Sequence, residues 1–158
     1  YIIFQLNYQL IVVLTLISAL MVTLVTDLKY YYISDRVIVI SSSLVALTYL
    51  KFLGVNSFLT HILSGTLMFI LMYLLKIITT KIFKKESLGD GDIKLMILIG
   101  LTLGVFNSFI SLFISSVTAL IYTILFIKKK DTLIPFGPFL LIGAIVTYIL
   151  VFYQITII

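Results

Sequence analysis

The sequence contains no cysteine and a single histidine, and each scarcity removes a class of chemistry. Without cysteine the chain cannot form a disulfide, use a thiol nucleophile or bind zinc through sulfur. One histidine, His61, also excludes a histidine-rich metal site, so we expect neither a metal nor another cofactor. No serine stands beside a His–Asp set, and no glycine-rich phosphate loop follows a strand. Carboxylates are the catalytic groups that this inventory leaves.

Charge is scarce as well. Charged residues make up 11% of the 158 residues, 62% are hydrophobic, and the mean hydropathy is +1.28. A soluble domain carries about 25% charged residues, so the composition predicts a polytopic membrane protein, with residues 1–158 forming one domain. The net charge of +5 does not indicate nucleic acid, because the basic residues lie between apolar runs and are typical of topology control.

The apolar runs predict an all-α fold of six membrane helices. The first run spans roughly 31 Å at about 1.5 Å per residue, which is the thickness of a bilayer core. It lacks the basic start and cleavage site of a signal peptide, so we interpret it as a retained span. Turns are expected at residues 54–57 and 107–108. The six runs cover residues 6–26, 37–53, 58–78, 93–106, 109–127 and 139–158.

Six spans would place nearly all charged residues on one side of the membrane. That side receives every basic residue except Lys51, which makes it the cytoplasmic side and puts both termini outside. The same side receives all six acids. Ionisable chemistry is therefore predicted at the cytoplasmic membrane face. The acids are Asp27, Asp35, Glu86, Asp90, Asp92 and Asp131.

Two of these acids are predicted at the same membrane depth, because Asp27 ends the first run and Asp92 begins the fourth. Asp92 taken alone could be a helix N-cap. Asp27 lies at the negative end of a helix dipole, where no structural rule calls for an acid. Two carboxylates brought together would share a proton, one activating water and the other protonating a carbonyl. The pair predicts an aspartic protease.

Three segments resemble the type IV prepilin peptidases, in family order and over essentially the whole chain. Residues 89–95 read Gly-Asp-Gly-Asp-Ile-Lys-Leu and resemble the family's Gly-x-Gly-Asp-x-Lys-Leu motif. Residues 27–36 resemble its other aspartate segment, with Ser34 where proline is usual. Residues 134–139 are similar to its late Ile-Pro-Phe-Gly-Pro-Phe segment. The Gly-x-Gly-Asp element alone is shared with presenilin-like proteases.

This resemblance implies a membrane-embedded aspartic endopeptidase acting at the cytoplasmic face. Such an enzyme removes the short basic leader from type IV prepilin-like or pseudopilin subunits, after a glycine and before the apolar helix. Its partners would be those substrates and the lipid bilayer. Larger members carry an N-terminal segment with paired cysteines, linked to zinc and N-methylation; no such segment is present here, so N-methylation is not predicted. By motif position, the catalytic pair is Asp27 and Asp92, with supporting roles for Asp35, Gly89, Gly91 and Lys94.

Three expectations about the neighbouring charges and two alternative functions accompany this interpretation. Lys94 is expected either to favour the ionised form of Asp92 or to extend into water. Glu86 and Asp90 are expected to be solvated acids outside the site.

A non-enzymatic proton-coupled carrier is one alternative function, but the span interiors offer only Ser, Thr and Gly, whereas a carrier usually has polar groups at mid-membrane. A presenilin-like intramembrane protease is the other, and residues 134–139 favour a prepilin-type substrate instead.

Overall fold

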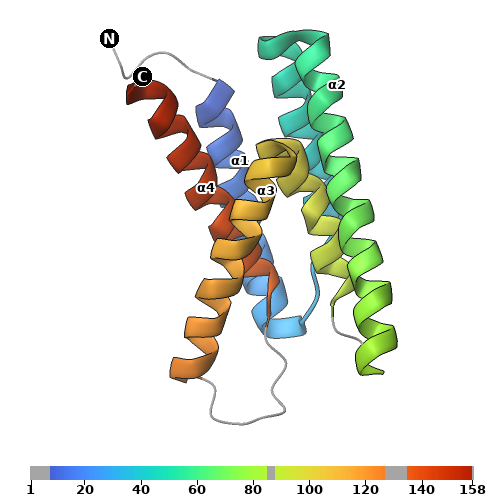
Figure 1. Cartoon of the computed structure of the whole chain (residues 1–158). Helices are drawn as coiled ribbons and strands as arrows, with labels where there is room; N and C mark the ends of the chain where they lie inside the picture. Colours follow the sequence, from blue (N-terminus) through green and yellow to red (C-terminus); the bar gives the residue numbers. More distant parts are fainter. Residues whose placement is uncertain (1–7, 85–87, 127–134, 158) are drawn as a thin grey trace.

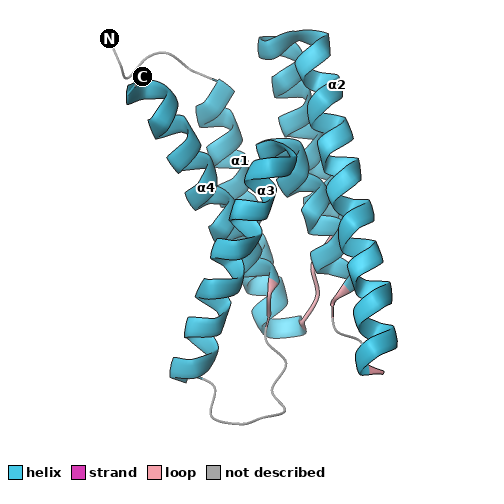
Figure 2. Ribbon diagram, viewed as in Figure 1, coloured by secondary structure: helices cyan, strands magenta, loops and turns pink. Residues whose placement is uncertain are grey.

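The computed structural model describes residues 8–84, 88–126 and 135–157, and the regular structure in these ranges is entirely α-helical. The described loop residues are short segments at the helix ends (Figure 2). This confirms the all-α fold class. The helices are α1 (Tyr8–Tyr30), α2 (Asp35–Phe83), α3 (Asp90–Phe126) and α4 (Gly137–Ile157).

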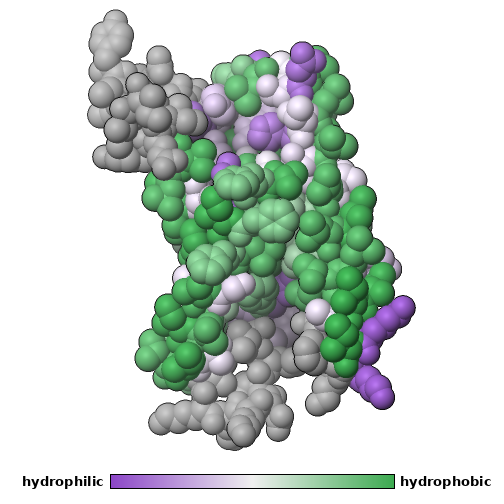
Figure 3. Space-filling view, in the orientation of Figure 1, coloured by the Kyte–Doolittle hydropathy of each residue, from purple (hydrophilic) through white to green (hydrophobic). Residues whose placement is uncertain are grey.

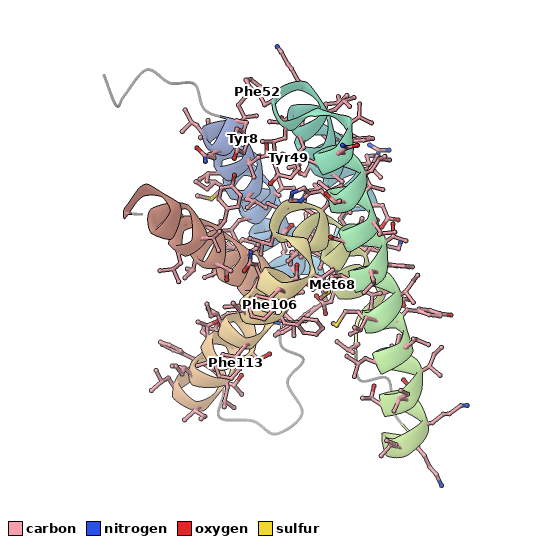
Figure 4. All side chains as sticks on the ribbon, turned by 45° about the horizontal axis from the view of Figure 1, so that its top comes forward. Tyr8, Tyr49, Phe52, Met68, Phe106 and Phe113 are labelled. Atoms are coloured by element: carbon pink, nitrogen blue, oxygen red, sulfur yellow. The ribbon has the colours of Figure 1, made fainter. Side chains whose placement is uncertain are left out.

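Apolar residues cover much of the surface, as expected for a membrane protein. Three of the described helices, α1, α2 and α3, are long and apolar enough to cross a bilayer, and Gly137–Val151 of α4 is a shorter apolar stretch. Large hydrophobic side chains dominate the visible face of the bundle (Figure 3). Phe106 and Phe113 point away from it and are 77% and 70% exposed (Figure 4). Lipid tails are as apolar as these side chains, so their exposure is not costly in a membrane.

Glycine breaks interrupt the two longest helices. Gly54 in α2 has φ 82° and Gly104 in α3 has φ 74°, a backbone region that glycine enters without a Cβ clash. The ribbon turns back on itself at both positions (Figure 1). The Gly54 break falls within the turn predicted at 54–57. The turn predicted at 107–108 is wrong: the chain breaks at Gly104, and residues 107 and 108 are helical.

Small residues allow the helices to approach closely. A Cβ placed on Gly65 of α2 would lie 2.8 Å from the Ile97 carbonyl oxygen of α3, and one on Gly100 of α3 would lie 2.8 Å from the Ser64 carbonyl oxygen of α2. Gly143 of α4 packs against Ser115 of α3 in the same way. Such contacts are the usual means of helix association in membranes, where the hydrophobic effect does not drive it.

The helix contacts form a closed ring, which determines where the charged ends meet. α1 and α3 each pack against both α2 and α4. The end of α1, the start of α3 and the start of α4 therefore lie at one end of the molecule (Figure 1). Asp27 belongs to the first of these termini and Asp92 to the second.

Candidate active site

Asp27 lies in the last turn of α1 and is only 6% exposed. The helix ends just beyond it because Tyr31 adopts a left-handed conformation, with φ 51°. The Tyr31 amide still donates a hydrogen bond to the Asp27 carbonyl oxygen, at 2.9 Å. A positive φ is uncommon for a bulky residue. Here it ends α1 and turns the chain sharply one turn after the carboxylate.

Asp92 lies in the first turn of α3 and is partly exposed. There is little room for a side chain on either of the two motif glycines beside it. A Cβ on Gly89 would lie 3.2 Å from Oδ2 of Asp92, and a Cβ on Gly91 would lie 2.8 Å from the Cβ of Ile33. Real Cβ atoms are seldom this close to another heavy atom. Gly89 therefore leaves room for the carboxylate, and Gly91 lets the loop between α1 and α2 approach α3.

The two aspartates line one cavity of about 390 Å³, although they come from different helices. They are close enough to interact electrostatically. All six residues that the motifs single out line this cavity, together with Tyr31, Tyr32, Ile33 and Asp90. Two carboxylates in one cavity can share a proton and hold a water molecule between them. The roles of the individual residues stay predictions.

Lys94 has a partner that neither expectation for it anticipated. Its Nζ donates to both carboxylate oxygens of Asp35, at 2.8 and 2.9 Å. The two side chains are 45% and 56% exposed, so this pair lies at the rim of the cavity. It connects the start of α3 to the start of α2, because Asp35 is the first residue of α2.

A second ion pair involves Asp90, which was expected to be only solvated. Its carboxylate is 76% exposed but accepts a hydrogen bond from Lys76 Nζ at 2.6 Å. This contact links the second half of α2 to the start of α3. The other acid expected to be solvated, Glu86, lies outside the described residues.

Three residues that surround Asp27 were not among the predicted site residues. The backbone N–H of Gly137, the first residue of α4, donates a hydrogen bond to Oδ2 of Asp27 at 3.1 Å. Thr23 lies one turn before Asp27 and is 1% exposed, and Ile33 is 6% exposed. Gly137 belongs to the segment 134–139, which the sequence marked only by its resemblance to a motif. Ile33 likewise belongs to the segment 27–36, which was marked by its resemblance to a motif, and no sequence signal singled out Thr23.

No set of three His, Asp or Glu side chains in the described ranges is arranged to hold a metal ion. What these ranges present is a helical membrane protein with a cavity lined by four aspartates, Asp27 and Asp92 among them. Comparison of the sequence with known protein families identifies the family. Residues 14–124, well over half of the chain, match the type IV leader peptidase family. The chain belongs to that family.

Two curated relatives agree with the family match. A Legionella pneumophila protein named prepilin leader peptidase/N-methyltransferase is 41% identical over 66 residues, which are 39% of this chain and 23% of that protein. An Escherichia coli O78:H11 (strain H10407 / ETEC) protein, named type 4 prepilin-like proteins leader peptide-processing enzyme, is 36% identical over 88 residues. These are 56% of this chain and 31% of that protein. The matched part thus spans about a quarter of the Legionella protein and about a third of the Escherichia coli protein. No protein of known structure matches the chain significantly.

Proposed function

We propose that this chain is the catalytic membrane domain of an aspartic endopeptidase that removes the short leader from type IV prepilin-like or pseudopilin subunits. The observation that carries the proposal is that Asp27 and Asp92, from separate helices, line the same cavity. The names of the two relatives support the choice of substrate. The family resemblance of residues 27–36 and 89–95 supports the choice of these two aspartates.

The reaction requires one proton shared between the two carboxylates. The ionised carboxylate takes a proton from water as the water oxygen attacks the scissile carbonyl carbon. The protonated carboxyl gives its proton to the carbonyl oxygen. The tetrahedral intermediate then collapses: the carbon–nitrogen bond breaks, the leaving nitrogen takes the proton that the first carboxylate received from water, and the second carboxylate takes a proton back from a hydroxyl of the intermediate. Asp92 lies at the N-terminus of α3, whose dipole favours negative charge on it, whereas Asp27 lies between the C-terminal end of its own helix α1 and the N-terminus of α4, whose dipoles act on it in opposite directions.

We infer that the cavity opens at the cytoplasmic face of a six-span protein. The breaks at Gly54 and Gly104 divide α2 and α3, so that four helices supply six segments. The segment of α3 before Gly104 is about 14 residues, or roughly 21 Å, and would begin below the membrane surface. Lys51 lies near the Gly54 turn, whereas the other described basic residues lie towards the ends of the helices that surround the cavity. By the positive-inside rule, the cavity end is cytoplasmic.

Replacing each aspartate by asparagine tests the proposal, because asparagine keeps the shape and removes the acid–base function. With the chain in lipid vesicles and a prepilin as substrate, Asp27→Asn and Asp92→Asn should each abolish release of the leader. Asp90→Asn is the matched control in the same motif and should keep most of the activity. Asparagine also caps helices well, so an active Asp92→Asn variant would reduce Asp92 to a helix cap and contradict the proposal.

A further inference from the structure

Gly137 lies where α4 begins, directly against the Asp27 carboxylate. We propose that Gly137 is a positioning residue of the active site: its backbone amide fixes the carboxylate of Asp27, and its missing side chain provides the space that the carboxylate occupies. The kinetic consequence of this inference rests on the proposed peptidase function. The hydrogen bond itself does not depend on that function.

The position of Gly137 in α4 explains why its amide is available. The first N–H groups of a helix have no partner within the helix. In α4, the amide of Leu140 bonds to the Phe136 carbonyl oxygen at 3.1 Å, and the residue after Gly137 is Pro138, which has no N–H. The Gly137 N–H is therefore directed outwards, and it donates to Oδ2 of Asp27 at 3.1 Å in a buried setting.

The space around Gly137 is filled on three sides. A Cβ placed there would lie 2.6 Å from Cδ1 of Ile33, 3.0 Å from Oδ2 of Asp27 and 3.1 Å from Cγ2 of Thr23. The Asp27 carboxylate is one of the three obstacles, so an added methyl group must displace either it or its neighbours. An alanine at this position thus crowds both Ile33 and the Asp27 carboxylate while leaving an amide donor in the chain, and under the proposal the carboxylate is what moves.

Ile33 extends the effect to the second aspartate. Its side chain packs against Gly137 at the start of α4 and also against Gly91, which directly precedes Asp92. The buried side chain of Ile33 therefore lies between the start of α4, which is hydrogen-bonded to Asp27, and the start of α3, which contains Asp92. A shift of Ile33 caused by bulk at position 137 would be transmitted to both carboxylates.

The hydrogen bond can be tested on the full chain without any activity. The protein has eight glycines, so labelling glycine with ¹⁵N in detergent micelles gives a small set of amide signals, and Gly137→Ala identifies one of them by its loss. Asp27→Ala should move the Gly137 amide proton upfield, since its charged acceptor is removed. Asp90→Ala, a control that removes an acid at the rim, should leave it in place. If the chemical shift of the Gly137 amide proton is unchanged in Asp27→Ala, the inference is wrong.

Kinetics then test the consequence for leader cleavage. Gly137→Ala should lower kcat by about a hundredfold, as expected for a small misplacement of a reacting group, and leave KM within a few-fold. Ile33→Val in that background removes one of the three obstacles and should restore part of kcat. If the wild-type chain cleaves no prepilin, the proposed function fails, while the amide signal still decides the role of Gly137.

A second glycine on the same helix provides the matched control. A Cβ on Gly143 would clash with Ser115 of α3, away from the cavity, so Gly143→Ala should reduce thermal stability and leave the kcat of the folded protein unchanged. Should Gly137→Ala behave in the same way, with lower stability and normal kcat, Gly137 would be a packing residue only and the inference would be wrong.

Discussion

Two cavities in the described part of the chain lie at opposite ends of α1 and are lined by polar side chains, but those side chains make different contacts. The cavity near Tyr8 measures about 230 Å³ and the one at Asp27 about 390 Å³. Tyr8 begins α1 and Asp27 lies in its last turn, so at about 1.5 Å per residue the two are roughly 28 Å apart. Both cavities contain ionisable groups within an apolar bundle.

Near Tyr8, the side chains of Tyr49 and His61 bond to the backbone. The break at Gly104 leaves the carbonyls of the preceding turn without helical partners. The Tyr49 hydroxyl donates to the Thr102 carbonyl oxygen at 2.7 Å, and His61 Nδ1 lies 2.8 Å from the Leu101 carbonyl oxygen. A carbonyl can only accept, so Nδ1 carries the proton. These side chains cap a broken helix and need no ligand to account for them.

At the other end the carboxylates complete no interrupted helix. Asp27 accepts one backbone hydrogen bond, from Gly137, but a carboxylate can accept about four. Burying Asp27 next to another acid therefore has an energetic cost that this one hydrogen bond offsets only in part. The comparison teaches that a buried ionisable group indicates function when the fold leaves most of its hydrogen-bonding capacity unused.

The largest effect is expected for a disulfide cross-link at the cavity end, because nearly all chains should either form it or fail to form it. The chain has no cysteine, so Ile33→Cys with Gly91→Cys introduces the only two thiols. The Cβ of Ile33 and a Cβ on Gly91 would be 2.8 Å apart, and a slight widening reaches the spacing of about 3.8 Å in a disulfide. Mild oxidation should close the bond nearly completely within one chain, as seen by a gel shift under non-reducing conditions. Single-cysteine variants control for bonds between chains. A folded double variant that resists oxidation would contradict the arrangement at the cavity end.

Removing the Tyr49 hydroxyl tests whether the cavity near Tyr8 has only a structural role. Tyr49→Phe should destabilise the protein by about 1–3 kcal/mol, because the buried Thr102 carbonyl loses its donor. Thermal unfolding in detergent measures the loss, and leader cleavage per folded molecule should be unchanged. If Tyr49→Phe were as stable as the wild type but inactive, the cavity near Tyr8 would have a functional role, and the contrast between the two ends would not hold.

The rim ion pair should give the smallest effect. Asp35→Lys opposes Lys94 with a like charge, so the melting temperature should fall slightly, more at low ionic strength than at high, because the pair is exposed and screened. The double exchange Asp35→Lys with Lys94→Asp should restore it. A melting temperature that the second exchange does not recover would show that the two residues act independently.

Several features of the fold and site could be predicted from the sequence because they depend on where apolar runs end. The run lengths predicted helices and the break at Gly54. The position of the acids at run ends predicted that Asp27 and Asp92 lie at one depth, and the structure brings them to one cavity. Depth along a helix follows directly from counting residues, since each adds about 1.5 Å.

Other features could not be predicted because they depend on rotation about the helix axes. Lys94 reaches Asp35 rather than Asp92 because of the direction in which α3 faces α2, which run lengths do not contain. The break falls not at 107–108 but at Gly104, where the backbone has a positive φ, and the carbonyls before it are bonded by Tyr49 and His61, which lie far away in the sequence. The contact of Gly137 with Asp27 depends on how α4 is seated against α1.

The most direct test of the account measures activity and stability together, on the same preparations of Asp92→Asn and Tyr49→Phe. We expect Asp92→Asn to release no leader while its free energy of unfolding stays within about 0.5 kcal/mol of the wild type. We expect Tyr49→Phe to cleave normally per folded molecule and to be clearly less stable. The opposite pattern, a destabilised but active Asp92→Asn protein beside a stable but inactive Tyr49→Phe protein, would contradict the assignment of chemistry to the Asp27–Asp92 cavity.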